Sequence, residues 1–252
     1  DPNQFSRLRR KYEETASDFI KAGDYEKAAF IYMKLLKDYR RAAATMEQGK
    51  HYAEAAAIYL KFLKEKNKAA HCYEMANMTT QALELYVELN HFEKAGDLYR
   101  QLGEEDEALR YYKKRASQLE QANSYLQMST LIDQKIMDRK WARDTLLIGW
   151  HKKAAAVNCA NEYFRLLPET ADPAYELRDF YEQRVDLHNG AQFIEVLRHQ
   201  RTARPMLQDL TRQFAYELVA KLSPAKPEIV SKLLHFVKDP ALSGDLMNFK
   251  RR

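Results

Sequence analysis

Along the first half of the chain, an alanine is followed four residues later by a large side chain, and this pair recurs at a nearly constant interval. Residues four apart lie one above the other on a helix, so each pair places a small and a large residue on one face. Successive alanines are separated by 13 or 14 residues. The seven pairs are Ala28/Tyr32, Ala42/Met46, Ala55/Tyr59, Ala69/Tyr73, Ala82/Tyr86, Ala95/Tyr99 and Ala108/Tyr112.

This interval predicts short helices joined by tight turns. Thirteen residues accommodate about ten residues of helix and about three of turn. A helix this short cannot bury its apolar face alone and has to pack against its neighbours. The small alanine permits a close approach and the aromatic residue fills the space beside it. We therefore predict an all-α fold, a right-handed α-solenoid of short antiparallel helical hairpins.

The turns suggest that the helices are grouped in pairs. Residues that tolerate the left-handed backbone conformation precede every second helix: Gly23, Gly49, Asn77 and Gly103. The helices that follow these four turns end in apolar clusters, whereas those between them end in polar residues such as Glu47. This alternation predicts a hairpin of about 26 to 28 residues, shorter than the 34 of a standard TPR. It also predicts that the helices after these turns form the more buried layer.

Two segments carry a resemblance to known repeat proteins. The segment Gly23–Tyr32, GDYEKAAFIY, and its echo His91–Tyr99, HFEKAGDLY, resemble the TPR-like α-solenoids of vesicle-coat, clathrin-heavy-chain and intraflagellar-transport proteins. The resemblance covers residues 23–115 and implies a scaffold role in protein assemblies. Because the repeat is shorter than a true TPR, it transfers no peptide-binding residues to this chain.

The regular interval fades after Arg115, although helical patterns continue. We expect helices over 117–138 and 140–167, the second interrupted at Gly149. Asp172 followed by Pro173 predicts a capped helix start. Further helices are expected over 191–200, 204–222 and 226–238. We divide the chain into a short-repeat α-solenoid, 1–115, and an irregular helical continuation or cap of the same superhelix, 116–252, with a separate second domain as the alternative.

Composition supports a folded, helical protein and bears on its location. Of 252 residues, 46% are hydrophobic and 31% charged, with only seven glycines and seven prolines. No apolar run reaches the length of a membrane span, and the first residues lack the pattern of a signal peptide. Cys72 and Cys159 have no CxxC partner, which favours buried thiols in a reducing compartment. We expect a cytoplasmic protein.

The sequence offers no combination of residues typical of an active site. It lacks HExxH, GxSxG, GxxxxGK and GxGxxG. His51, His71 and His91 are spaced by 20 residues, but two fall in turns and one within a helix, which argues against a shared metal. The acidic run Glu104–Glu107 is typical of a helix N-terminus, and the tyrosines belong to the core rather than to a base-stacking platform. We predict no catalytic, metal or cofactor site and no enzyme.

Three functions remain to be compared. The leading hypothesis is a non-catalytic protein–protein interaction scaffold, because stacked short helices expose an extended surface. The second is nucleic-acid binding, since the net charge is +5 and the pI about 8.9. The third is the accessory solenoid of an enzyme whose active-site residues lie unrecognised in 116–252. The basic residues behind the second hypothesis are Arg7, Arg9, Arg10, Lys11, Lys113, Lys114, Arg115, Lys250, Arg251 and Arg252.

One set of charged residues alternates with the helices. The residue before the repeat alanine is Arg41, Lys68 or Lys94 on the second helix of each hairpin, but mixed in sign on the first. Helices of like parity recur once per hairpin, so these three side chains should form a column. We predict that the column receives an acidic segment of a partner protein. Ordinary solvated charges are the alternative, because Glu47 and Glu74 lie on the same helices.

Overall fold

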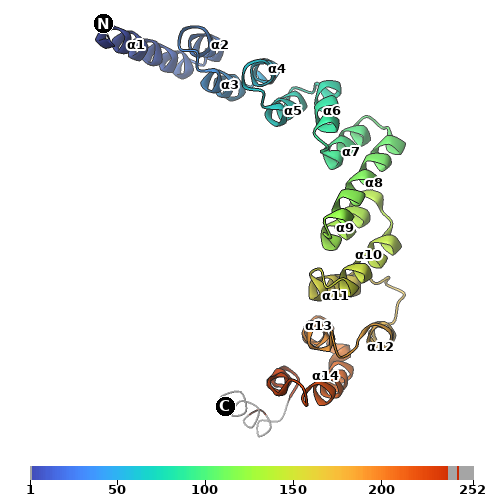
Figure 1. Cartoon of the computed structure of the whole chain (residues 1–252). Helices are drawn as coiled ribbons and strands as arrows, with labels where there is room; N and C mark the ends of the chain where they lie inside the picture. The colour runs from blue at the N-terminus through green and yellow to red at the C-terminus, as the bar shows by residue number, and fades with distance from the viewer. Residues whose placement is uncertain (1, 238–242, 244–252) are drawn as a thin grey trace. The chain divides into compact units, whose positions relative to one another are not determined.

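The computed structural model describes residues 2–237 and Ser243, and within this part of the chain every regular element is a helix. Most helices pack chiefly against the helices next to them in sequence, an order that can be followed by colour in Figure 1, and α11 (Ala156–Arg165) also packs against α13 (Gly190–Ala203). The all-α prediction is confirmed for these residues. The chain divides into two compact units, 1–115 and 116–252, and the division falls within α8 (Glu105–Gln121).

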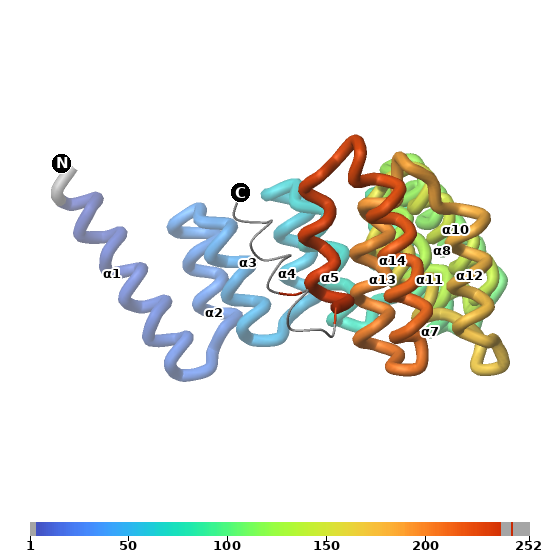
Figure 2. The backbone as a smooth tube through the Cα atoms, turned by 90° about the horizontal axis from the view of Figure 1, so that it is seen from below, coloured from blue at the N-terminus to red at the C-terminus, as the bar shows by residue number. Residues whose placement is uncertain are grey.

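The first unit begins with one long helix, followed by the short helices that the interval of 13 residues predicts. Figure 2 shows this change of length between α1 and the helices after it. Two of the short helices, α2 and α4, continue into a π-helical turn. The elements are α1 (Pro2–Lys21), α2 (Tyr25–Phe30), η1 (Ile31–Leu35), α3 (Tyr39–Gln48), α4 (Tyr52–Ile58), η2 (Tyr59–Leu63), α5 (Lys66–Met75), α6 (Thr79–Glu88) and α7 (Phe92–Gln101), before α8.

The repeat alanines lie at the helix contacts. Ala28, Ala42, Ala55, Ala69, Ala82, Ala95 and Ala108 are all 0% exposed. The large residue four positions later alternates in burial. On η1, η2, α6 and α8 the tyrosine is buried, whereas Met46, Tyr73 and Tyr99 on α3, α5 and α7 are only half-buried. Burial therefore repeats every two helices, with the more buried large residues on the helices that follow Gly23, Gly49, Asn77 and Gly103.

The turns differ from the sequence prediction in one respect. Every junction from α1 to α8 contains a residue of positive φ, so the left-handed conformation does not mark alternate junctions. The prediction for Gly49 is wrong: its φ is −80°, and Lys50 takes the left-handed conformation at φ 62°. Glycine is needed at 49 for another reason, because a Cβ there would lie 2.6 Å from the Cβ of Tyr25.

Aspartates cap the starts of several helices. The side chains of Asp24, Asp38 and Asp138 accept hydrogen bonds from the backbone N–H three residues later, at 3.2, 3.0 and 2.9 Å. Such caps satisfy N–H groups that have no partner inside the helix, which stabilises short helices in particular. One of the three, Asp138, lies in the second unit, so the two units share this device.

The second unit contains helices of more varied length. The predicted start at Asp172 is confirmed, because its side chain accepts a hydrogen bond from the Ala174 N–H at 2.9 Å with Pro173 in the first turn. Its elements after α8 are α9 (Tyr125–Leu131), η3 (Ile132–Ile136), α10 (Arg139–His151), α11 (Ala156–Arg165), α12 (Pro173–Arg184), α13 (Gly190–Ala203), η4 (Pro205–Leu207), α14 (Gln208–Leu222) and η5 (Pro227–His235), of which η4 and η5 are 3-10 helices.

Buried pairs of residues four positions apart continue beyond Arg115, which the sequence interpretation missed. The predicted boundary between 138 and 140 is confirmed, because α10 begins at Arg139. The helix predicted over 117–138 is wrong, since it is divided at Asn123, and the helix over 140–167 is interrupted after His151 rather than at Gly149. Buried pairs four residues apart recur in each of α9, α10 and α11. They are Met128/Ile132, Ala142/Leu146 and Cys159/Tyr163. Methionine and cysteine replace alanine in two of them, which conceals the pattern in the sequence.

The core of the second unit is aromatic. The ring of Trp150 on α10 lies edge-on to Phe180 at 5.4 Å and to Phe193 at 6.0 Å, and these two rings stack at 5.5 Å. The indole N–H of Trp150 donates to the backbone oxygen of Arg184 at 3.1 Å. Helices α10, α12 and α13 are therefore joined through one cluster of rings.

Candidate functional site

The sequence-predicted site residues lie on three helices of the first unit. Arg41 is on α3, Lys68 on α5 and Lys94 on α7, each one residue before a fully buried alanine. This register turns the basic side chains outward, and they are 53–54% exposed. The structure therefore places all three on the solvent side of their helices.

Each of these bases is paired with carboxylates. Arg41 lies 3.4 Å from Glu13 on α1 and 3.4 Å from the capping Asp38. Lys68 lies 2.8 Å from Glu65, and this hydrogen bond lowers the pKa of that carboxyl from its ordinary value, against the opposing effect of burial.

Lys94 lies 3.5 Å from Glu74 on α5. The pairs formed by Arg41 and Lys94 thus each join helices two apart in sequence, α1 to α3 and α5 to α7. Bases and carboxylates share this face, so the set is a mixed-sign surface rather than a uniformly basic column.

The charged groups of two bases also lie over aromatic rings. The guanidinium of Arg41 lies 5.7 Å from the ring centroid of Tyr32, and the ammonium of Lys68 lies 5.1 Å from that of Tyr59. Each ring belongs to the preceding helix of the chain. Contacts of this kind contribute about 0.5–1 kcal/mol at exposed positions, so part of the role of these bases is to stabilise the stack.

A second repeated contact was not anticipated from the sequence. The hydroxyls of Tyr59, Tyr86 and Tyr112 each donate to a carboxylate on the preceding helix: Glu47, Glu74 at 2.6 Å and Asp97 at 2.7 Å, respectively. Burial, and then the neighbouring carboxylate, raises the pKa of all three tyrosines above their ordinary value. A partial signal existed, because Glu47 and Glu74 both lie five residues after a repeat alanine.

The histidines and cysteines do not assemble into a reactive site. His51 lies 3.5 Å from Glu26 and His71 lies 3.8 Å from Glu74, while the ring of His91 stacks on Tyr86 at 6.0 Å. Within residues 2–237, no three metal-ligating side chains converge. Both cysteines are buried and unpaired, and burial raises the pKa of each thiol to about 11, which keeps them protonated and unreactive.

The other charged features have local partners. In the acidic run at the start of α8, Glu105 pairs with Arg100 at 3.3 Å and Glu107 with Arg110 at 3.2 Å. Four of the basic residues considered for nucleic-acid binding are similarly engaged. Arg9 pairs with Glu13, Arg10 with Glu14 and Arg115 with Glu93 at 3.4, 3.5 and 3.9 Å, and Lys114 lies over the ring of Tyr111 at 4.4 Å. Lys250, Arg251 and Arg252 lie outside the described residues.

None of the helices in the described part of the chain combines the length and the apolar character needed to cross a membrane. No protein-family model matches the chain, and neither does any curated protein.

Proposed function

We propose that this protein is a non-catalytic scaffold for protein–protein interaction, built on a right-handed α-solenoid of short antiparallel hairpins. The observation that carries the proposal is the complete burial of seven consecutive repeat alanines on helices too short to fold alone. Helices that stack in this way bury their apolar faces against each other and expose their polar faces as an extended surface. The resemblance of the repeat segments to the solenoids of vesicle-coat, clathrin-heavy-chain and intraflagellar-transport proteins agrees with this role.

The hairpin arrangement is supported by two independent features. Burial of the large repeat residue alternates from one helix to the next. Ion pairs join helices of like parity, Arg41 to Glu13 and Lys94 to Glu74. Both are expected when successive helices alternate between two layers. A cytoplasmic location is part of the proposal, supported by two buried, unpaired cysteines.

The proposed partner surface in the first unit is the set Arg41, Lys68 and Lys94. Their ion pairs are exposed, and exposed pairs contribute only about 0–1 kcal/mol. An acidic segment of a partner is therefore able to replace the internal carboxylates at small cost. Because the bases repeat with the hairpin, a partner segment would contact several of them at once.

The test is a charge reversal with a matched control. We expect Arg41→Glu, Lys68→Glu and Lys94→Glu together to abolish recovery of partners when the full chain is purified from the native cells and its partners are identified by mass spectrometry. The control reverses Lys34, Lys61 and Lys113, which are exposed on η1, η2 and α8. Circular dichroism checks that both variants fold. Equal loss with both sets, or with neither, would show that this surface does not bind partners.

Nucleic-acid binding has a distinct signature. Phosphate contacts make affinity fall steeply as salt rises. We expect no specific binding of oligonucleotides at physiological salt, measured by fluorescence anisotropy. Submicromolar affinity for a defined oligonucleotide under these conditions would replace the scaffold proposal.

A further inference from the structure

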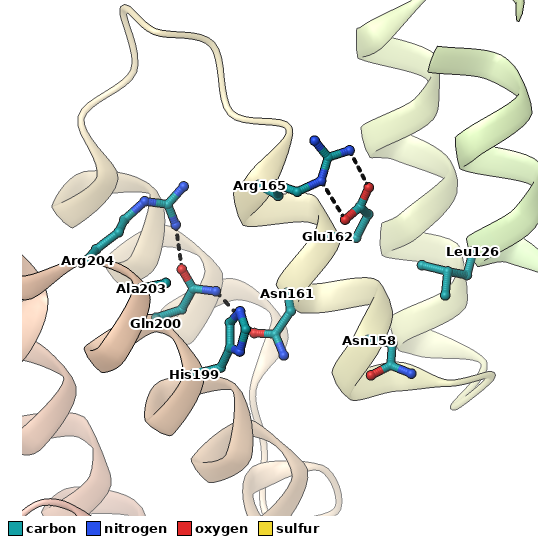
Figure 3. A pocket seen from close by; sticks show the side chains of 9 residues that line it. All are labelled: Leu126, Asn158, Asn161, Glu162, Arg165, His199, Gln200, Ala203 and Arg204. Atoms are coloured by element: carbon teal, nitrogen blue, oxygen red, sulfur yellow. Dashed lines mark hydrogen bonds and ion pairs between the residues drawn. The ribbon is translucent and has the colours of Figure 1, made fainter. Parts of the chain in front are cut away.

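A polar groove lies between α11 and α13 of the second unit, with Leu126 of α9 at its edge. Figure 3 shows its side chains projecting from the facing helices. The groove has a volume of about 530 Å³, open to solvent. Its polar lining comes mainly from Asn158, Asn161, Arg165, His199, Gln200 and Arg204.

The floor of the groove is held by a buried glutamine. Gln200 is 1% exposed, and both ends of its side chain are bonded: Nε2 donates to Asn161 Oδ1 at 3.1 Å, and Oε1 accepts from Arg204. Arg204 also donates to the backbone oxygen of Phe164 at 2.6 Å. These bonds hold Asn161 and Arg204 in fixed positions on opposite walls. A binding site with such preordered groups loses little side-chain entropy when a ligand enters.

The groove contains donors and acceptors that the protein does not use itself. Asn161 accepts from Gln200 through Oδ1, which leaves its Nδ2 without a partner among the described residues. The side chains of Asn158 and His199 have none there either. A carboxamide carries both a donor and an acceptor, the same two groups that a peptide backbone presents at each residue.

The spacing along α11 suits an extended chain. Asn158, Asn161 and Arg165 follow one another at three and four residues and so share one helix face. From the first to the last, the helix rises about 10 Å, which equals about three residues of extended peptide. A peptide lying along this face meets two carboxamides and then a guanidinium.

The charge of the groove favours an acidic ligand. Its single carboxylate, Glu162, is already held by Arg165 in a two-pronged contact at 2.8 and 2.6 Å. Burial lowers the pKa of the Arg204 guanidinium from its ordinary value, because the charged group is partly removed from water. Its attraction to a ligand carboxylate is therefore screened less than that of a fully exposed arginine.

The basic character extends beyond the groove. An adjoining hollow of about 360 Å³ shares His199 with it and is lined by Arg198 and Arg201. The carboxylate nearby, Glu195, is bound by both Arg198 and Lys232. Arginines therefore outnumber carboxylates along this side of α13, and each carboxylate has its own partner.

We propose that this groove binds an extended acidic segment of a partner protein, with Asn158 and Asn161 pairing to its backbone and Arg165 and Arg204 receiving its carboxylate. The inference rests on the proposed role in protein–protein interaction, but not on the basic residues of the first unit. Glu162 occupies Arg165 in the unbound protein and is displaced by the carboxylate of the ligand.

Glu162 supplies the sharpest consequence of this proposal. A ligand carboxylate has to compete with Glu162 for the same guanidinium and also meets its like charge. Removing the charge with Glu162→Gln should therefore strengthen binding, by about threefold or more. A groove without a function in binding acidic chains would show no such gain.

The experiment measures fluorescence anisotropy of labelled peptides with the full chain. One probe is a short peptide of alternating glutamate and threonine, which favours an extended backbone, and the other replaces each glutamate by glutamine. We expect the acidic peptide to bind at least about tenfold more tightly, and Asn161→Ala and Arg165→Gln each to weaken it about tenfold. The control is Arg178→Gln, an exposed arginine on α12 outside the groove, which should change nothing.

Misfolding is separated from loss of binding by a double variant. Arg165→Gln leaves Glu162 unpaired, whereas Arg165→Gln with Glu162→Gln removes one charge of each sign and restores the net charge of the groove. The thermal melting of this double variant should match that of the unaltered protein while its binding stays weak. Recovery of full binding in this double variant would show that Arg165 does not receive the ligand.

Several outcomes would overturn the proposal. These are equal binding of the two peptides, equal loss with Arg178→Gln, or binding of inorganic phosphate or a single-stranded oligonucleotide in place of the peptide. If the peptide fails to bind while native partners are still recovered with the full chain, the groove assignment is wrong and the scaffold proposal stands. If partners are also absent, both are wrong.

Discussion

The two units solve the same packing problem with different residues. In the first unit, alanine occupies every helix contact at 0% exposure and a tyrosine or methionine fills the space beside it. In the second, a cluster of large rings centred on Phe180 joins α10, α11, α12 and α13. One small residue repeated at every contact keeps the helices short and evenly spaced, whereas large rings allow helices of 10 to 14 residues to share a core.

The units nevertheless share one device, a glycine where two helices approach most closely. A Cβ on Gly96 of α7 would lie 2.6 Å from a ring carbon of Tyr112, and a Cβ on Gly149 of α10 would lie 2.6 Å from the sulfur of Cys159. In both units the backbone of one helix therefore contacts a side chain of another directly. The two units therefore differ mainly in the large residues that fill their cores, and less in the small residues at the helix contacts.

The strongest way to test the contrast is to remove the largest ring of the aromatic cluster. We expect Trp150→Ala to lower the free energy of unfolding by about 3–5 kcal/mol, because it leaves a cavity between α10, α12 and α13 and removes a hydrogen bond to the Arg184 backbone. Urea unfolding followed by circular dichroism measures this. Trp141→Ala is the control, since Trp141 is only half-buried, and an equal loss there would contradict a special role of Trp150 in the core.

Overpacking tests the alanine contacts of the first unit. Ala82→Phe places a ring where the structure has no space, and we expect a loss of about 1–3 kcal/mol. The neighbouring Gln81 is exposed, so Gln81→Glu should change stability by less than about 0.5 kcal/mol. Urea unfolding measures the change in the free energy of unfolding of each variant, and we expect hydrogen exchange to locate the loss in α5 to α7. Equal tolerance at both positions would remove the basis of the repeat.

A pair of glycine substitutions compares the units directly. Gly96→Ala and Gly149→Ala should each cost about 1–2 kcal/mol through the contacts with Tyr112 and Cys159. Whether each substitution lowers or raises the free energy of unfolding is informative, because alanine is the better helix former by about 1 kcal/mol and this preference opposes the steric cost. Ala57→Gly, at an exposed helical position, measures that preference alone. A stabilising Gly→Ala change in either unit would show that its helices can move apart at little cost.

Removing one tyrosine hydroxyl should have a smaller effect. Tyr86→Phe keeps the ring in place but deletes the hydrogen bond to Glu74, and we expect a loss of about 1 kcal/mol in urea unfolding. Tyr175→Phe is the matched control, because this side chain is 66% exposed and should be neutral. Matching losses would mean that the contact with Glu74 contributes nothing.

The smallest effect appears only at alkaline pH. Burial and the hydrogen-bonded carboxylates raise the pKa of Tyr59, Tyr86 and Tyr112 above the ordinary value of 10.0. A group with a raised pKa in the folded state stabilises fully below its unfolded pKa, and this contribution is lost as pH rises through the folded value. The free energy of unfolding should therefore fall above pH 10, and less so in the triple Tyr→Phe variant. Identical pH profiles would assign the fall to other groups.

The sequence by itself determined the helical class and the identity of the contact residues as far as Ala108. The helical class and the contact residues both follow from the interval of four residues, because residues four apart share one face of a helix. This geometry depends on the single helix and not on its neighbours. The cap at Asp172 was predictable for the same reason. In the second unit the same reasoning failed at Met128 and Cys159, because larger side chains there take the buried position that alanine fills in the first unit. Which residue fits such a position depends on the neighbouring helices.

Only the tertiary structure decided the features that depend on a neighbouring helix. The close approach of Tyr25 to Gly49 joins two helices, and the carboxylate partners of the tyrosines lie 12 or 15 residues away. The groove unites Asn161 with Gln200 and Phe164 with Arg204, pairs about 40 residues apart in the chain. Sequence spacing cannot place such residues, because their distance is set by how α11 packs against α13.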